Sequence, residues 1–228
     1  MFTDRHGGVS RAPYDSLNLG DHVDDDPLAV AENRTRLART LAGGAVDPAG
    51  WVWLRQVHGH HVVNVDAPPA HPPVADAAVT GRAELPLVVL TADCAPVALI
   101  APDAVGVVHA GWPGLEQGVL GAAVEALRTL SPGPIRAVLG PCVHAGRYEF
   151  GADLLERLVA RLGPDVAGRT DTGTPALDIP AAVRVSLARA GVDDLDDVDI
   201  CTAASSDHFS HRRDGVTGRQ AVVVVRNR

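Results

Sequence analysis

The chain has 228 residues, 46% hydrophobic and 4% aromatic, so an aliphatic core is expected and a disordered or collagen-like chain is excluded. Its formal charge of −8 argues against a general nucleic-acid binder, because neutralising phosphate groups requires a basic face. All 20 basic residues are arginine, and the absence of lysine excludes Schiff-base chemistry and the lysine of a P-loop.

Targeting signals are not expected. Residues 1–10 contain no apolar segment typical of a signal peptide, and no apolar run reaches the ~18 residues of a membrane span. Three cysteines are an odd number, so a disulfide scaffold is not expected. We therefore expect a cytoplasmic protein.

The first predicted regular element is a helix that follows a polar segment of 26 residues with a turn at 13–16. Asp26 is suited to cap this helix and Pro27 suits its first turn. Gly43 and Gly44 are expected to end it.

Short apolar runs predict a strand-rich middle. Trp51–Gln56 and His61–Asp66 are separated by four residues, which predicts a β-hairpin. Three further runs are too apolar for one-sided exposure, so we expect them in one central sheet covered on both faces. These runs are Leu85–Thr91, Pro96–Ala101 and Val105–His109.

Helices and strands alternate in the second half of the chain. Apolar periodicity predicts helices over 114–130, 153–162 and 179–190, the last ended by Gly191. Strands are expected at 135–140, 199–202 and 221–226, with a polar loop at 203–219 and a flexible stretch at 163–174. The pattern predicts one α/β domain with a mixed sheet, spanning residues 1–228.

Residues suited to binding a metal ion stand at the ends of three apolar runs. The segments are Gln56-Val-His-Gly59, Thr91-Ala-Asp-Cys94 and His109-Ala-Gly-Trp112. Their spacing is unlike a zinc finger, but strand ends and helix starts are common places for active sites. A His/Cys/His set suits a soft-to-borderline divalent ion, and three protein ligands leave the open position typical of catalytic zinc.

Other interpretations of these residues stay open at this point. A buried cysteine is often inert, and a single histidine at a strand end is often structural. His60, His61 and His71 are alternative ligands in the same region. Four further histidines are expected to be solvated, although they could line the rim of a pocket: His22, His144, His208 and His211.

Arginines are the candidate anion-binding groups. Arg212 and Arg213 stand in a Gly-containing loop, where paired guanidinium groups suit phosphate or carboxylate, although exposed arginines of no special role are an equal interpretation. Arg5 and Arg34 are further candidates. Asn18, between two leucines, either fixes the N-terminal arm or contacts a ligand.

Ten ordered motifs give the chain a family resemblance. They are Gly8-Val-Ser, Ser16-Leu-Asn-Leu-Gly20, Asp25-Asp-Pro, Glu32-Asn-Arg34, the three segments at 56–59, 91–94 and 109–112, Leu139-Gly-Pro141, Tyr148-Glu149, and Arg212-Arg-Asp-Gly215 with Thr217-Gly-Arg-Gln220. From about residue 5 to residue 225 the chain resembles the laccase-domain family. Members of that family are named polyphenol oxidases, multicopper oxidoreductases, purine nucleoside phosphorylases or peptidoglycan editing factors.

The resemblance implies an α+β fold of mixed sheets packed as a sandwich with helices outside, the architecture of cysteine-hydrolase-like toxins. It implies one zinc ion on His58, Cys94 and His109. It also implies a purine nucleoside pocket with phosphorylase, methylthioadenosine phosphorylase and adenosine deaminase activities. The chain departs from the family pattern at Pro113, where an arginine is usual, and also at Arg147 and His211.

Ligand count favours zinc over copper. A multicopper oxidase needs many paired histidines, whereas only His58 and His60 form an H-x-H pair, and the only methionine is Met1. Asp93, beside Cys94, is the candidate proton carrier or orienting partner. Phosphate would be neutralised by Arg34, Arg212 or the amides at the helix start after His109.

The predicted site therefore has three groups of residues. The catalytic candidates are Cys94, His109 and Asp93; the substrate-binding candidates are Asn18, Arg34 and Arg212; the metal ligands are His58, Cys94 and His109. Two other hypotheses stand beside the zinc enzyme acting on purine nucleosides and phosphate. One is a metal-independent cysteine hydrolase with Cys94 as nucleophile, and the other is a peptidoglycan editing factor. The oligomeric state is left open.

Overall fold

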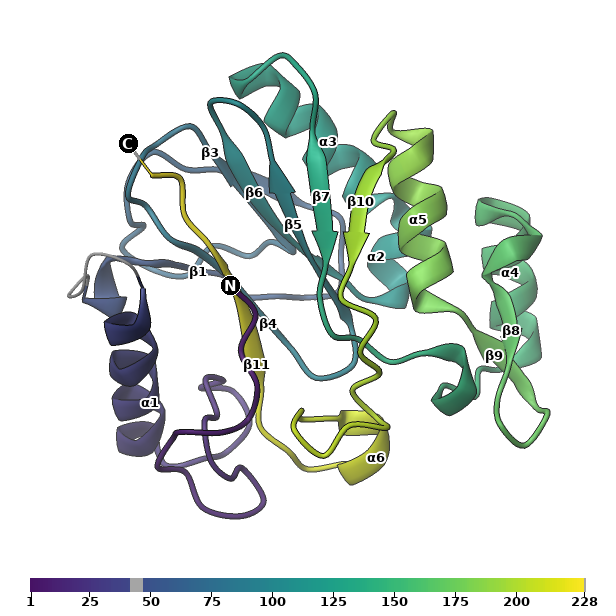
Figure 1. Cartoon of the computed structure of the whole chain (residues 1–228), viewed down its shortest axis with the longest axis horizontal. Coiled ribbons are helices and arrows are strands. Elements are labelled where there is room, and N and C mark those ends of the chain that lie inside the picture. Colours follow the sequence, from purple (N-terminus) through teal and green to yellow (C-terminus); the bar gives the residue numbers. More distant parts are fainter. Residues whose placement is uncertain (42–46, 228) are drawn as a thin grey trace.

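Two β-sheets pack face to face in the computed structural model, which describes residues 1–41 and 47–227 (Figure 1). Helices cover the outer surface of each sheet. The expected α+β sandwich with external helices is therefore confirmed.

The larger sheet has six strands in the order β10-β7-β5-β6-β3-β2. Strands β5, β6, β3 and β7 pair antiparallel, whereas β2 and β10 join the two edges in parallel, which makes the sheet mixed. In chain order the strands are β2 (Val62–Asn64), β3 (Ala77–Thr80), β5 (Ala95–Ile100), β6 (Val105–Ala110), β7 (Arg136–Leu139) and β10 (Asp194–Asp197).

The smaller sheet consists of β1 (Val52–Trp53), β4 (Leu87–Thr91) and β11 (Gln220–Val224), with β4 in the middle. Leu87 and Val89 pack between the sheets, while Val88 and Leu90 face α1. The three apolar runs are thus buried on both faces as predicted. The expectation of one shared sheet is wrong, because β4 belongs to the smaller sheet and β5 and β6 to the larger.

The predicted hairpin between residues 51–56 and 61–66 is also wrong. Strand β1 pairs with β4, and β2 pairs with β3 in the other sheet. The segment between them crosses from one sheet to the other, because its backbone N–H groups bind the side chain of Asp76 instead of closing a two-stranded turn.

Helix α1 (Pro27–Thr40) begins where the sequence predicts. The Asp26 side chain accepts a hydrogen bond from the Leu28 N–H, and Leu37 and Ala38 pack on the smaller sheet. The helix ends at Thr40, with Leu41 extended. The two glycines predicted to end it, Gly43 and Gly44, lie outside the described residues.

The free face of the larger sheet is covered by α2 (Trp112–Gln117), α3 (Val119–Leu130) and α5 (Ile179–Arg189). Helix α4 (Ala152–Leu162) packs outside them, against α2 and α5. The single helix predicted over 114–130 is two helices, because Gly118 adopts a left-handed conformation (φ +87°) that ends α2 and starts α3.

Three expectations for the C-terminal half need correction. The expected strand at 199–202 is only a bridge between Cys142 and Cys201, whereas the acidic edge strand β10 was not predicted. The stretch at 163–174 is ordered by a 3₁₀ turn (Pro164–Val166) and by β8 (Ala167–Arg169), which pairs with β9 (Pro175–Leu177). The loop at 203–219 contains α6 (His211–Asp214). Two short 3₁₀ turns, Pro48–Gly50 and Ala145–Arg147, complete the elements described.

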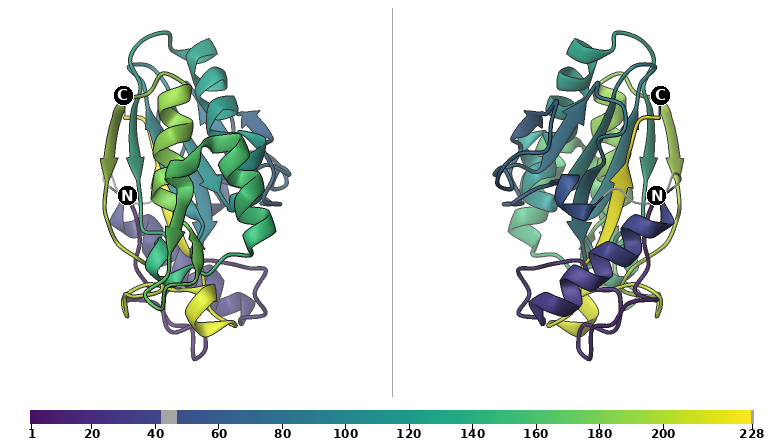
Figure 2. Two further views of the ribbon diagram at one scale, coloured as in Figure 1. Left: turned by 90° about the vertical axis from the view of Figure 1, so that its right-hand side faces the viewer. Right: turned by 90° about the vertical axis from the view of Figure 1, so that its left-hand side faces the viewer.

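The N-terminal arm (residues 1–26) and the α6 loop (residues 203–219) lie side by side at one end of the sheets, as Figure 2 shows. Backbone hydrogen bonds join them, from the Arg5 N–H to the Asp207 carbonyl and from the Leu19 N–H to the Arg219 carbonyl. Within the described residues, none of the helices has the length and apolar character needed to cross a membrane.

Candidate metal centre and active site

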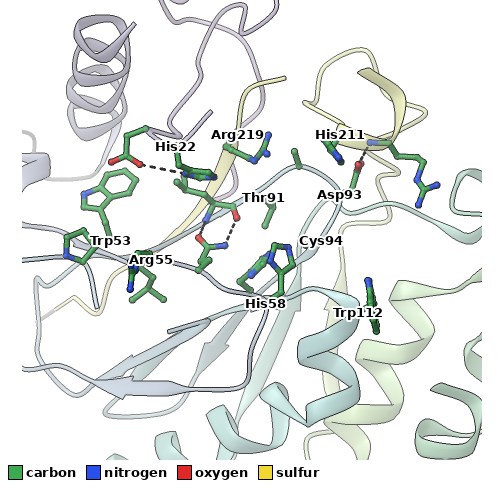
Figure 3. Close-up of a pocket in the computed structure, with 18 of the residues that line it drawn as sticks. His22, Trp53, Arg55, His58, Thr91, Asp93, Cys94, Trp112, His211 and Arg219 are labelled. Atoms are coloured by element: carbon green, nitrogen blue, oxygen red, sulfur yellow. Dashed lines mark hydrogen bonds and ion pairs between the residues drawn. The ribbon is translucent and has the colours of Figure 1, made fainter. Parts of the chain in front are cut away.

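The three predicted metal ligands meet at this end of the molecule, and Figure 3 labels two of them, His58 and Cys94. His58 follows β1, Cys94 directly precedes β5, and His109 lies on β6. One ligand atom from each lies within 4.8 Å of the others. Cys94 and His109 are brought together by the antiparallel pairing of β5 with β6, in which Pro96 is opposite His109.

A buried carboxylate organises two of these three ligands. Asp76 is completely buried, and its Oδ1 lies 2.8 Å from His109 Nδ1. The same side chain accepts hydrogen bonds from the backbone N–H groups of residues 57, 58 and 59 at 2.7–3.2 Å. Burial raises the pKa of Asp76, but the hydrogen bonds from His109 and the backbone outweigh it and lower that pKa overall. Because Asp76 occupies Nδ1, the Nε2 atom of His109 is left for a metal ion.

The turn at His58 has an unusual backbone conformation. His58 has φ +58°, a left-handed conformation that is costly for a residue other than glycine. The three N–H groups that converge on Asp76 compensate this strain. Gly111 packs against the ligands, and a Cβ there would lie 2.7 Å from His58 Cδ2 and 3.2 Å from Cys94 Sγ.

Cys94 and His109 form a charged pair without a metal. Burial raises the pKa of the Cys94 thiol, but the positive charge of His109 and hydrogen bonds from both histidines lower it to about 6. Burial lowers the pKa of His109, while the Cys94 thiolate and Asp76 raise it to about 9. A thiolate and two imidazoles are donors that zinc and other borderline divalent ions accept, so these residues fit a metal ion.

These ligands open into a cavity of about 720 Å³. Figure 3 shows His58 and Cys94 between Trp53 and Arg55 at one end and Trp112 and His211 at the other. The rest of the lining comprises Asp21, His22, Arg34, Leu54, Gln56, Pro72, Leu90, Thr91, Ala92, Asp93, His109, Tyr148, Arg212 and Arg219.

Tyr148 contributes a neutral phenol to this lining. Burial and the nearby Cys94 charge raise the pKa of Tyr148 to about 12, against the opposing effect of Arg212. The phenol therefore keeps its proton at neutral pH.

Asp93 anchors the loop that carries α6. Its Oδ1 accepts hydrogen bonds from the hydroxyls of Thr202 and Ser210 at 2.6 and 2.7 Å, and its Oδ2 accepts one from the Arg212 N–H at 2.6 Å. With three donors on one carboxylate, this geometry favours the predicted orienting role over proton transfer.

Arg34 lines the cavity but is held by the protein. Its Nε and Nη2 atoms donate to the Leu19 carbonyl, and Nη2 lies 3.2 Å from an Asp21 carboxylate oxygen. The guanidinium also stacks over the Trp53 ring at 4.0 Å, and Trp51 stacks with Trp53 at 5.9 Å. These contacts leave few donors for a ligand, so Arg34 supports the cavity wall.

The two arginines predicted as a pair separate in the structure. The Arg212 guanidinium lies over the Tyr148 ring at 4.7 Å and faces the cavity. Arg213 points away and binds the carbonyls of Thr202, Ser205 and His208 together with Asp214. Only Arg212 of this pair is available to a ligand in the cavity.

Asn18 does not line the cavity, and it positions a residue that does. Its Oδ1 accepts hydrogen bonds from the N–H groups of Gly20 and Arg219, and its Nδ2 donates to the Gly20 carbonyl and to Asp25. Of the two interpretations left open by the sequence, the structure favours fixing the N-terminal arm.

The remaining histidines divide by position. His22 and His211 line the cavity rim, whereas His144 and His208 do not. His60 and His61 are exposed on a shallow surface depression beside α3, where His60 Nδ1 lies 2.8 Å from Gln117 Oε1. Within the described residues, the only cluster of three or more potential ligands is His58, Cys94 and His109.

Sequence reasoning missed Asp76 and Arg219. The signal for Asp76 was present, because it stands in the apolar run Ala75-Asp-Ala-Ala-Val79, where a carboxylate needs strong partners to be buried. Arg219 stands in the motif Thr217-Gly-Arg-Gln220, but the sequence did not single it out, since its contacts depend on the distant arm that packs around it.

The fold and the site define an α+β protein of two packed sheets with one candidate metal centre open to a cavity. The family model described as multi-copper polyphenol oxidoreductase laccase matches residues 1–227, and the chain belongs to this family. A relative from Streptomyces griseus named purine nucleoside phosphorylase is 50% identical, with 96% of this chain and 91% of the relative covered. A Streptomyces coelicolor relative of the same name is 48% identical, with 96% of this chain and 92% of the relative covered.

Solved structures agree with these sequence relatives. The crystal structure of YlmD from Geobacillus stearothermophilus matches with a TM-score of 0.91 and 33% identity, covering 100% of this chain and 91% of YlmD. The crystal structure of the Neisseria meningitidis protein NMB0706 matches with a TM-score of 0.86 and 34% identity, covering 99% of this chain and 93% of NMB0706. The names of the sequence relatives support the interpretation that this protein is an enzyme.

Proposed function

We propose that this protein is a purine nucleoside phosphorylase that binds zinc at His58, Cys94 and His109, and that it also deaminates adenosine and phosphorolyses methylthioadenosine. The observation that carries the proposal is the position of this donor cluster on a cavity that also contains arginines and a neutral phenol. The names of the relatives support the substrate class.

Zinc is proposed over copper because of the donor set. The family description names several coppers, but the described residues contain a single cluster of three or more potential ligands. The only methionine, Met1, contacts β11 at the chain start, so it is no axial ligand for this cluster. When bound here, zinc supplies Lewis acidity that makes water nucleophilic near neutral pH.

Phosphorolysis requires the protein to position phosphate and to protonate the leaving base. A phosphate oxygen attacks C1′, the bond from C1′ to N9 breaks, and its electron pair moves to the purine, which takes up a proton. Tyr148 keeps its proton and lines the cavity, so we assign its hydroxyl to bind the base by donating a hydrogen bond. Arg212, over the same ring, is assigned to substrate binding, while Arg34 supports the cavity wall and Asn18 positions Arg219.

Deamination replaces the amino group at C6 of adenine with the oxygen of a water molecule and releases ammonia. For this reaction the protein must hold the three metal ligands rigidly and keep other donor groups away from the metal ion. Asp76 keeps the proton of His109 on Nδ1 and fixes the His58 turn. Phosphate takes no part, so the two reactions are separable in the same cavity.

A metal-independent cysteine hydrolase is the second candidate, and a specific geometry favours it. Asp76 binds His109 Nδ1, and His109 in turn lowers the pKa of Cys94 to about 6, which is the order of groups in a Cys-His-Asp triad. Metal content separates this candidate from the phosphorylase. The cytoplasmic location that we propose is supported by three free thiols, Cys94, Cys142 and Cys201.

The test uses protein purified without added metal. We expect about one zinc per chain by elemental analysis, and phosphate-dependent release of adenine and ribose 1-phosphate from adenosine. Inosine and ammonia should form without phosphate. His58→Ala should lose zinc and both activities, whereas His60→Ala, two residues away and outside the cluster, should keep them. A metal-free protein that turns over no nucleoside but hydrolyses acyl or amide substrates would support the hydrolase instead.

A further inference from the structure

The half-buried guanidinium of Arg219 lines the cavity and makes no ion pair with a carboxylate among the described residues. Its Nη1 donates to the carbonyls of Thr217 and Gly218, both at 2.9 Å. Among residues 1–41 and 47–227, no acidic oxygen lies within 4.0 Å of this guanidinium, unlike those of Arg34 and Arg213. Its Nε and Nη2 atoms donate no hydrogen bond to any of the residues that the structure describes.

The N-terminal arm is built around this arginine. Asn18 Oδ1 accepts a hydrogen bond from the Arg219 N–H at 2.8 Å, and the Leu19 N–H donates to the Arg219 carbonyl at 3.0 Å. A Cβ at Gly20 would lie 2.8 Å from Arg219 Cγ, so the arm passes too close for any larger residue. Burial lowers the pKa of Arg219, and the charges of Cys94 and Asp93 partly oppose this effect.

The other cavity arginines are less suited to bind a buried anion. Arg34 is occupied by the Leu19 carbonyl, Asp21 and Trp53. Arg55 and Arg212 are exposed to solvent, where a single charge interaction is weak. Arg219 combines partial burial, fixed position and unused donors.

We infer that Arg219 forms an oxyanion subsite that binds the phosphate co-substrate. This inference rests on the proposed phosphorolysis. A forked guanidinium with unused donors suits the tetrahedral oxygens of inorganic phosphate or of a phosphate ester on a nucleotide. The subsite is assigned to inorganic phosphate, because the nucleoside reaction needs it beside the ligand cluster.

The first experiment compares Arg219→Gln with Arg5→Gln. Arg5 is a matched control, since it is also a half-buried arginine beside the N-terminal arm, stacked over Phe209 and outside the cavity lining. Zinc-loaded Arg219→Gln should raise the apparent KM for phosphate roughly 10- to 100-fold. The KM for adenosine, the zinc content and phosphate-independent deamination should stay within about threefold of the wild type.

This comparison distinguishes a wrong phosphate subsite from a wrong proposed function. If the wild type releases no purine base with phosphate, the proposed phosphorolysis is wrong. If the wild type is active and a folded, zinc-loaded Arg219→Gln keeps its phosphate KM, the subsite is wrong. Arg219→Lys, which keeps the charge but loses the fork, should lie between the two.

A second measurement needs no variant and so does not depend on folding. Phenylglyoxal modification of the wild-type holoenzyme is mapped by mass spectrometry with and without ligands. Saturating inorganic phosphate should protect Arg219 and leave Arg5 unprotected. No protection of Arg219 would overturn the inference. Protection by a nucleoside 5′-monophosphate but not by inorganic phosphate would overturn the co-substrate assignment in favour of a phosphate ester.

Discussion

Replacing Asp76 by asparagine tests how the metal centre is held together. The carboxylate is completely buried and accepts hydrogen bonds from three consecutive backbone N–H groups and from His109 Nδ1. An asparagine of the same shape replaces one oxygen by an NH₂ group. Either His109 or the turn at 57–59 then faces a donor instead of an acceptor.

The expected magnitudes follow from these contacts. A hydrogen bond to a charged group contributes ~1.5–3 kcal/mol, and an unsatisfied buried donor costs ~1–3 kcal/mol. Asp76→Asn should therefore lower the free energy of unfolding of the metal-free protein by roughly 2–4 kcal/mol, or the Tm by about 5–12 °C. Because both His58 and His109 lose their orienting partner, zinc affinity should fall roughly 10- to 100-fold.

Zinc affinity is measured by competition with a chromophoric chelator, and stability by thermal unfolding in excess chelator. Asp93→Asn is the matched control, because Asp93 is also a buried carboxylate with several donors but holds the α6 loop instead of the histidines. It should destabilise the protein while leaving zinc affinity within about threefold. A wild-type zinc affinity in Asp76→Asn would refute the idea that this carboxylate organises the centre.

Three further predictions follow from the site. Cys94→Ala should abolish zinc binding and nucleoside turnover, since it removes the only thiolate of the cluster; a zinc-loaded, active variant would exclude Cys94 as ligand and nucleophile. Gly111→Ala should weaken zinc binding at least about tenfold with little loss of secondary structure by circular dichroism, because the new methyl group would displace His58 and Cys94; unchanged affinity would contradict the close packing. Arg34→Ala should lower the Tm and both activities together, with no selective change in phosphate KM, because its donors are bound to Leu19 and Asp21; a selective rise in that KM would identify Arg34 as the phosphate ligand instead.

Local chemistry made part of the fold predictable. The Asp26 cap marked the start of α1, and runs of Val, Leu and Ala marked the buried strands. The two sheets were harder to separate, because a strand buried on both faces has the same composition whether its neighbours are helices or another sheet. The run at 87–91 could therefore not be assigned to the smaller sheet from its composition.

Long-range contacts account for what the sequence did not predict. Residues 57–60 have the composition of a turn, but Asp76, 17 or more residues away, binds the N–H groups of residues 57–59, and the chain continues into another sheet. The helix over 114–130 has continuous apolar periodicity, and Gly118 interrupts it only through a backbone conformation that the periodicity does not reveal. The metal ligands were predictable because each stands at the end of an apolar run.

One construction recurs at the three loops that face the cavity. A functional side chain stands on a loop or in the short helix α6, and a buried polar side chain from elsewhere in the chain binds the N–H of that same residue. The pairs are Asp76 with His58, Asp93 with Arg212, and Asn18 with Arg219. Because the anchor binds the backbone, the imidazole or guanidinium of the functional residue is not consumed by its own positioning.

This construction explains why the site needs no regular element beneath each of its residues. A buried anchor holds loop backbone more firmly than solvent-exposed contacts would, since breaking it leaves an unsatisfied polar group in the interior. The anchors themselves lie in or beside the two sheets or in the arm that packs on them. The loops thereby gain the rigidity of the core while their side chains stay free for metal, phosphate and nucleoside, which is the preorganisation that catalysis by charge stabilisation requires.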